Sequence, residues 1–79
     1  MSDIAENYLL DLGALLKEAA LDAKTGATSK TGTSADQFAL GRATAYYEVI
    51  SLMEQQAKTF GLDPKMISLD GFDADKDLL

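Results

Sequence analysis

Two apolar repeats with the period of an α-helix dominate this sequence and limit what it can fold into. Over residues 3–24 the repeat alternates intervals of four and three, at Ala5, Leu9, Leu12, Leu16, Ala19 and Ala23. Over residues 35–60 it does the same at Ala39, Ala43, Tyr46, Ile50, Met53, Ala57 and Phe60. This spacing places one continuous apolar stripe along each of two amphipathic helices. We therefore expect an all-α fold.

The segment between the repeats, residues 25–34, contains two glycines, many hydroxyl side chains and no large apolar group. Nothing in it offsets the entropy lost on ordering, so we expect a flexible loop. A connection of this length lets the helices fold back on each other, which predicts a long antiparallel hairpin. Whether the loop orders when a partner binds stays open.

Residues with known capping preferences mark the ends of both helices. Asp3 with Glu6, and Ser34 with Gln37, have the spacing of a capping box. Gly61 follows Phe60 and is expected to end the second helix in the left-handed conformation.

Beyond Gly61 the chain reads as a short return segment of the same domain, residues 1–79. Asp63 and Pro64 suit the cap and first position of a short helix. Asp70 and Gly71 indicate a turn at the start of an acidic C-terminal segment, residues 70–79. We expect the last residues to fray and four apolar side chains to pack on the hairpin: Met66, Ile67, Leu69 and Phe72.

Small residues inside the two helices predict a close contact. A helix-interior glycine costs about 1 kcal/mol relative to alanine and usually serves close packing. Gly13 of the first helix is matched by three small residues of the second, Ala39, Gly41 and Ala43. The sequence predicts a tight crossing and leaves open which helices cross.

Core size points to association. A domain of 79 residues buries only about 60% of the surface of its unfolded chain. The chain has no Cys or His for disulfides or zinc, so self-association or a partner is the remaining means of support. The wide apolar stripes leave five side chains in need of cover: Tyr8, Leu15, Phe38, Val49 and Leu52. We therefore expect a homodimer in which two hairpins form a four-helix bundle.

Charge limits the classes of partner. Thirteen acidic and seven basic residues give a net charge of −6, which disfavours direct nucleic-acid binding. The acids suit a basic protein surface, although solubility alone also explains them. The absence of cysteine, of a basic and apolar leader and of any long uncharged stretch predicts a cytoplasmic protein that does not cross a membrane.

Two acidic groupings resemble sites only in part. Asp73, Asp75 and Asp77 have the spacing of the first ligands of a calcium loop, but Leu78 stands where that loop requires glycine. Glu18 and Asp22 lie one helical turn apart with no further catalytic group near them in sequence, which favours an exposed polar face. We assign no catalytic, cofactor-binding or metal-binding residues.

Arg42 is the only arginine and lies within reach of an aromatic ring or of a carboxylate on another segment. Tyr46 and Tyr47 point in different directions, so we expect one in the core and the other at solvent or a partner. The candidate partner-binding residues are Arg42, Tyr47, Asp73, Asp75 and Asp77.

The function that these features favour is a small, acidic, non-enzymatic protein–protein interaction module. A sharper hypothesis, motivated by size and charge, is a phage or mobile-element inhibitor that binds a basic surface of a host complex. The alternative is a purely structural homo-oligomerisation module.

Overall fold

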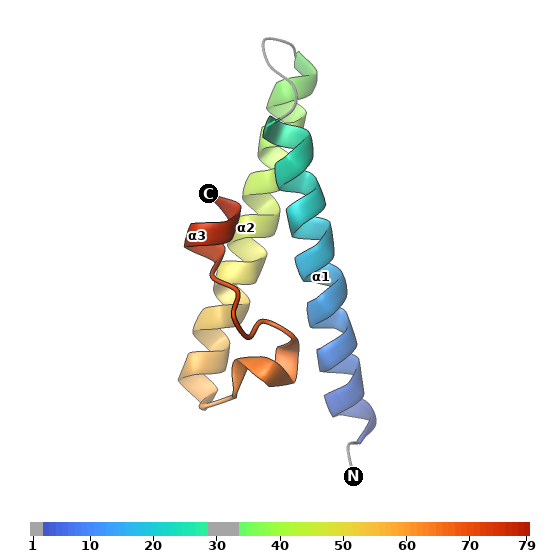
Figure 1. Ribbon diagram of the computed structural model, residues 1–79, viewed down its shortest axis with the longest axis vertical. Coiled ribbons are helices and arrows are strands. Elements are labelled where there is room, and N and C mark those ends of the chain that lie inside the picture. Colours follow the sequence, from blue (N-terminus) through green and yellow to red (C-terminus); the bar gives the residue numbers. More distant parts are fainter. Residues whose placement is uncertain (1–2, 29–33) are drawn as a thin grey trace.

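Two long antiparallel helices form the body of the molecule (Figure 1). The computed structural model describes residues 3–28 and 34–79, in which α1 spans Ile4–Thr28 and α2 spans Ser34–Phe60. A 3-10 helix, η1, spans Pro64–Ile67, and a short helix, α3, spans Ala74–Leu78. The predicted all-α hairpin is confirmed. Neither long helix, within the described residues, has the apolar character over enough of its length to cross a membrane.

The outer ends of the two long helices are capped as the sequence predicts. The backbone N–H of Glu6 donates to Asp3 Oδ1 over 2.7 Å, which satisfies one free donor of the first turn of α1. At the end of α2, Gly61 has a φ of +69°. The N–H groups of Gly61 and Leu62 donate to carbonyls in the last turn of α2 over 3.2 and 2.8 Å. This arrangement is the Schellman motif expected at Gly61.

α1 continues to Thr28, so the expectation that it ends near residue 24 is wrong. A threonine in a helix can satisfy its own hydroxyl locally, and Thr25 Oγ1 donates to the Leu21 carbonyl over 3.0 Å. Hydroxyl side chains alone therefore do not end this helix. The rest of the predicted loop, residues 29–33, and the predicted cap by the Ser34 side chain lie outside what the structure describes.

A close backbone contact joins α1 to η1. A Cβ built on Gly13 would lie 1.8 Å from the Ile67 carbonyl oxygen, so only glycine fits there. Beside it, Ser68 Oγ donates to the Leu10 carbonyl over 2.7 Å. The predicted tight contact thus exists at Gly13, but its partner is the return segment. At Gly41 a Cβ would meet nothing within 4 Å, so no contact within this chain explains that glycine.

The end of the chain is ordered as α3, and the expectation that it frays is wrong. Asp73 caps the helix by accepting from the N–H groups of Asp75 and Lys76 over 2.9 and 3.3 Å. Ala74 and Leu78 are buried against the hairpin. The acidic pattern hid two apolar positions four residues apart, which is one face of a helical turn.

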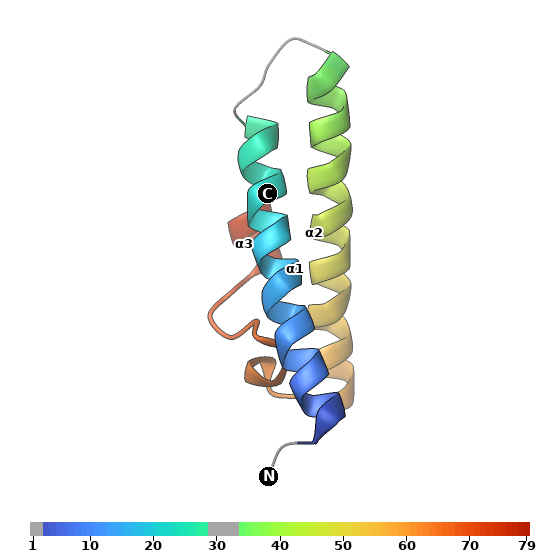
Figure 2. The same cartoon turned by 90° about the vertical axis from the view of Figure 1, so that its right-hand side faces the viewer.

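The core lies on one side of the hairpin. η1 and α3 occupy the same side of α1 and α2 in both views (Figures 1 and 2). Among the expected packing residues of this segment, Phe72 is half-buried and Met66 stays exposed, so the prediction for Met66 is wrong. The buried cluster draws on all four elements: Ala20, Ile50, Ala57, Ile67, Leu69, Ala74 and Leu78.

Candidate interaction surface

The side of the hairpin that residues 61–79 cover, called the covered side below, is fixed to α2 by two polar contacts. Tyr47 donates its hydroxyl proton to Asp75 Oδ1 over 2.6 Å. The backbone N–H of Ala74 donates to Glu54 Oε2 over 3.1 Å. Tyr47 and Glu54 lie two helical turns apart on one face of α2, so this face holds α3 at two points.

Two lysines of α1 hold the same segment from the other helix. Lys24 Nζ donates to the Asp77 carbonyl oxygen over 2.9 Å. Lys17 Nζ lies 5.9 Å from the centre of the Phe72 ring, within the range of a cation–π contact. The C-terminal segment therefore bridges both long helices.

Two groups on the covered side, Glu54 and Tyr47, have raised pKa values. Partial burial raises the pKa of Glu54 above its usual range. The N–H of Ala74 works against this shift, while the aspartates within residues 73–77 add to it. The hydrogen bond to Asp75 raises the pKa of Tyr47, since the phenol must keep its proton to donate it.

Four of the five candidate partner-binding residues come together on the covered side. Tyr47, Asp73 and Asp75 make the contacts described above, and Asp77 Oδ2 accepts from the backbone N–H of Asp73 over 2.8 Å. Both Tyr46 and Tyr47 are half-buried and pack against the core, so the expectation that only one of them does is wrong. These contacts give the three aspartates and Tyr47 a structural role in docking α3.

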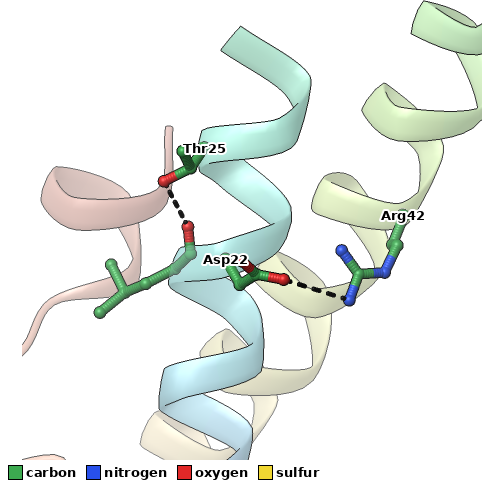
Figure 3. Close-up of polar contacts among 4 residues, drawn as sticks. Asp22, Thr25 and Arg42 are labelled. Carbon is green, nitrogen blue, oxygen red and sulfur yellow. Dashed lines mark hydrogen bonds and ion pairs between the residues drawn. The ribbon is translucent and has the colours of Figure 1, made fainter. Parts of the chain in front are cut away.

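Arg42 lies elsewhere, on the side of the hairpin away from α3 (Figure 3). Its Nη2 atom is 3.9 Å from Asp22 Oδ2 of α1, and its guanidinium lies 5.4 Å from the centre of the Tyr46 ring. The expected reach to an aromatic ring and to a carboxylate of another segment is confirmed. Because both charged side chains are exposed, their pairing contributes only about 0–1 kcal/mol.

The Arg42–Asp22 pair shows which apolar side chains share this second side. Residues that are separated by about two or about five full turns return to the same face of an α-helix. On α1, Leu15 and Ile4 precede Asp22 by these two intervals. On α2, Val49 and Phe60 follow Arg42 by the same two intervals. The apolar stripes of α1 and α2 therefore flank the ion pair.

We call this second side the open face. Three further exposed side chains extend these stripes, because Tyr8, Phe38 and Leu52 each lie one helical turn from Ile4, Arg42 and Val49 respectively. The open face thus has seven large apolar side chains, each between 42 and 87% exposed: Ile4, Tyr8, Leu15, Phe38, Val49, Leu52 and Phe60. Five of them are the side chains that the sequence marks as needing cover, and the structure leaves all five exposed. η1 and α3 both lie on the opposite side of the hairpin (Figures 1 and 2), and of the return segment Ser68 shares a wide, open hollow with Ile4 and Tyr8 at the start of α1.

A shallow apolar hollow of about 180 Å³ opens at one end of the open face. Its walls come from the early part of α1, the end of α2 and the return segment. The ribbons of α1 and α2 diverge toward this end of the hairpin (Figure 1). The lining of the hollow combines both long helices with the return segment: Leu9, Met53, Gln56, Ala57, Phe60, Leu62 and Ile67. A large side chain of a partner fits a depression of this kind.

The predicted burial of Phe60 is wrong. The repeat assigns it to the buried stripe of the second helix, but the side chain is 73% exposed. The helices diverge at this end (Figure 1), and Leu62 and Ile67 of the return segment line the hollow beside Phe60. The whole-turn interval between Arg42 and Phe60 is the sequence signal that places Phe60 on the open face.

The groups available for chemistry are carboxylates, amines and hydroxyls. Within residues 3–28 and 34–79, no group of three or more acidic residues is arranged to hold a metal ion. A cleft of about 410 Å³ between α2 and the C-terminal segment is mainly apolar and includes Glu54, Lys58 and Asp73. These polar groups belong to the side that docks α3.

Comparisons of the chain with protein-family models, with curated proteins and with solved structures found no match.

Proposed function

We propose that this chain is a small, acidic, non-enzymatic protein–protein interaction module that binds its partner through the open face. The observation that supports the proposal is the row of seven exposed apolar side chains on the side of the hairpin that residues 61–79 leave uncovered. Soluble proteins rarely expose contiguous apolar surface of this kind unless another molecule covers it. The cytoplasmic location expected from the sequence belongs to the same proposal.

Small size and negative charge support a sharper form of this function. A chain of 79 residues with a net charge of −6 suits a phage or mobile-element inhibitor that occupies a basic surface of a host complex. In this form Arg42 and its surroundings contact the partner. Tyr47, Asp73, Asp75 and Asp77 contribute less, because contacts within the chain already use them.

A second candidate is a purely structural homo-oligomerisation module. Two antiparallel helices with an uncovered apolar side are half of a four-helix bundle, and a second copy would complete the homodimer that the sequence predicts. In that case the open face is consumed by assembly and binds nothing else.

Two matched leucines of α2 separate the candidates. Leu52 on the open face and Leu40 away from it are 59 and 54% exposed, so a glutamate at either position leaves the packed core untouched. For an interaction module, Leu52→Glu abolishes capture of the partner from cells that produce the protein, Leu40→Glu does not, and both variants unfold at the wild-type temperature. For a structural oligomer, Leu52→Glu dissociates the assembly and lowers its unfolding temperature together.

The dependence of partner capture on salt concentration tests the inhibitor hypothesis. If a basic surface is the target, raising the ionic strength weakens capture by the wild-type protein. Capture that is insensitive to salt, or a captured partner without a basic surface, would count against the inhibitor hypothesis while leaving the interaction module in place.

A further inference from the structure

Basic residues are unevenly divided between the two sides of the hairpin. Every lysine within residues 3–28 and 34–79 either contacts the segment 61–79, lines the cleft beside it or belongs to it: Lys17, Lys24, Lys58, Lys65 and Lys76. The covered side therefore balances its acids with amines.

On the open face, acidic residues outnumber basic ones. Asp11 and Glu18 lie one helical turn from apolar residues of the α1 stripe, and Glu48 lies one turn from Leu52 on α2. All three side chains are exposed, as is Asp22. Against these four carboxylates, the described part of the open face offers one cation, the Arg42 guanidinium already paired with Asp22. The apolar surface thus has an acidic border.

This border distinguishes between possible occupants. A second copy would bring two acidic borders together, with no lysine of the described open face to offset them, and such juxtaposition of like charge across an interface is unfavourable. A partner with basic residues beside its apolar contacts would gain from the same carboxylates. Charge therefore favours a basic partner over self-association.

The shape of the open face favours a helical partner. Its apolar side chains follow two antiparallel helices, and on α2 they extend from Phe38 to Phe60, about 33 Å at 1.5 Å per residue. A third helix can lie along two others at an axial separation of 8–10 Å. A helix of about 20 residues has the length to match this stripe.

We infer that the open face binds an amphipathic α-helix whose apolar stripe is flanked by lysine or arginine. The inference rests on the proposed function and specifies the chemistry of its partner. The helix lies along the α1–α2 groove, one of its large apolar side chains enters the hollow beside Phe60, and its basic flanks face Asp11, Glu18 and Glu48.

Three synthetic peptides of about 20 residues test the inference. They share one leucine stripe of helical period and differ only in the flanking residues, which are Lys, Gln or Glu. Isothermal titration should show the Lys-flanked peptide binding at least about tenfold more tightly than the Gln-flanked peptide at low salt. That preference should shrink as the ionic strength rises.

Leu52→Glu separates binding at the open face from non-specific attraction to an acidic protein. It adds negative charge, so attraction by charge alone would tighten binding of the Lys-flanked peptide, whereas binding at the open face should weaken about tenfold or more. Leu40→Glu adds the same charge elsewhere and should not weaken it. A double variant, Asp11→Asn with Glu18→Gln, should bring the affinity for the Lys-flanked peptide toward that of the Gln-flanked one.

Each contrary result has its own meaning. Equal affinity for the Lys- and Gln-flanked peptides would overturn the basic chemistry of the partner and leave the proposed function standing. Loss of binding with Leu40→Glu and not with Leu52→Glu would overturn the location. Failure of a monomeric wild-type protein to bind any of the three peptides would overturn the helical partner, while partner capture would still decide the proposed function.

Discussion

The two sides of the hairpin differ sharply in how far their apolar side chains are buried. Ile50 is fully buried, whereas Val49, its neighbour in sequence, is 42% exposed. The first faces the core completed by residues 61–79, and the second lies on the open face. Residues 61–79 cover one side of the two long helices and leave the other side exposed. The uncovered side is thus where the molecule can still gain free energy from association.

The largest expected effect contrasts the core with the open face. Ile50→Ala should lower the free energy of unfolding by about 3–4 kcal/mol, because it empties a fully buried site. Leu52→Ala should change it by no more than about 0.5 kcal/mol, since that side chain is already largely solvated. Urea denaturation of both variants measures the difference. Where Ile50→Ala fails to fold, Ile50→Val should still show a loss of about 1 kcal/mol. Similar losses for Ile50→Ala and Leu52→Ala would contradict the contrast.

Alanine substitutions at two glycines should change the stability of the protein in opposite directions. Gly13→Ala should destabilise the protein by about 1–3 kcal/mol, because the new methyl group would collide with the Ile67 carbonyl and displace η1. Gly41→Ala should stabilise it by up to about 1 kcal/mol, because the methyl group meets open space within a helix. Thermal unfolding of the two variants tests both signs. If Gly41→Ala were destabilised instead, the surface of α2 at Gly41 would have to be in contact with another molecule in solution.

The cap of α3 is expected to matter less. Asp73→Ala should cost about 1 kcal/mol, because it leaves two N–H groups of the first turn without their acceptor. Asp73→Asn keeps a capping oxygen and should retain most of the stability. Amide hydrogen exchange in residues 74–78 reports the effect directly. Unchanged protection in Asp73→Ala would show that burial of Ala74 and Leu78 holds α3 without the cap.

The smallest effect concerns the charge on Glu54. Its pKa is raised in the folded chain, so the folded state holds this proton more firmly than the unfolded state does. The stability that this proton contributes is present below the ordinary carboxyl pKa and is lost as pH rises through the raised one. Glu54→Gln keeps an oxygen for the Ala74 N–H and should unfold at a slightly higher temperature than wild type near neutral pH.

The Glu54→Gln advantage should disappear under acidic conditions, where the wild-type carboxyl is protonated. Thermal unfolding of both proteins across that pH range supplies the test. An advantage that stays constant with pH would show that the ionised carboxylate is not the cause.

Local signals made much of the hairpin predictable. The period of the apolar repeats and the residues Asp3, Asp63 and Gly61 act within a few positions of sequence, and the structure has the expected caps at all three. The docking of α3 was not predictable in this way. Its stability depends on Leu78 and Ala74 meeting helices far away in sequence, which an alternation of aspartates does not reveal.

The open face was predictable in part, because apolar periodicity is a local signal. Stripes wider than one neighbouring helix can cover leave residues such as Leu15 and Phe38 exposed, and that follows from periodicity. The exposure of Phe60 depends on the divergence of two helices, which only the three-dimensional arrangement shows. The uneven division of lysines between the two sides likewise becomes visible only when the structure shows which side of the hairpin residues 61–79 cover.

The most direct test of the central claim, that the open face is left for a basic partner, is the solution mass by light scattering across the micromolar concentration range. We expect a folded monomer of 8.4 kDa throughout the series, with no change for Leu52→Glu. A stable wild-type dimer that dissociates in Leu52→Glu and persists in Leu40→Glu would contradict it, because a second copy would then cover the open face.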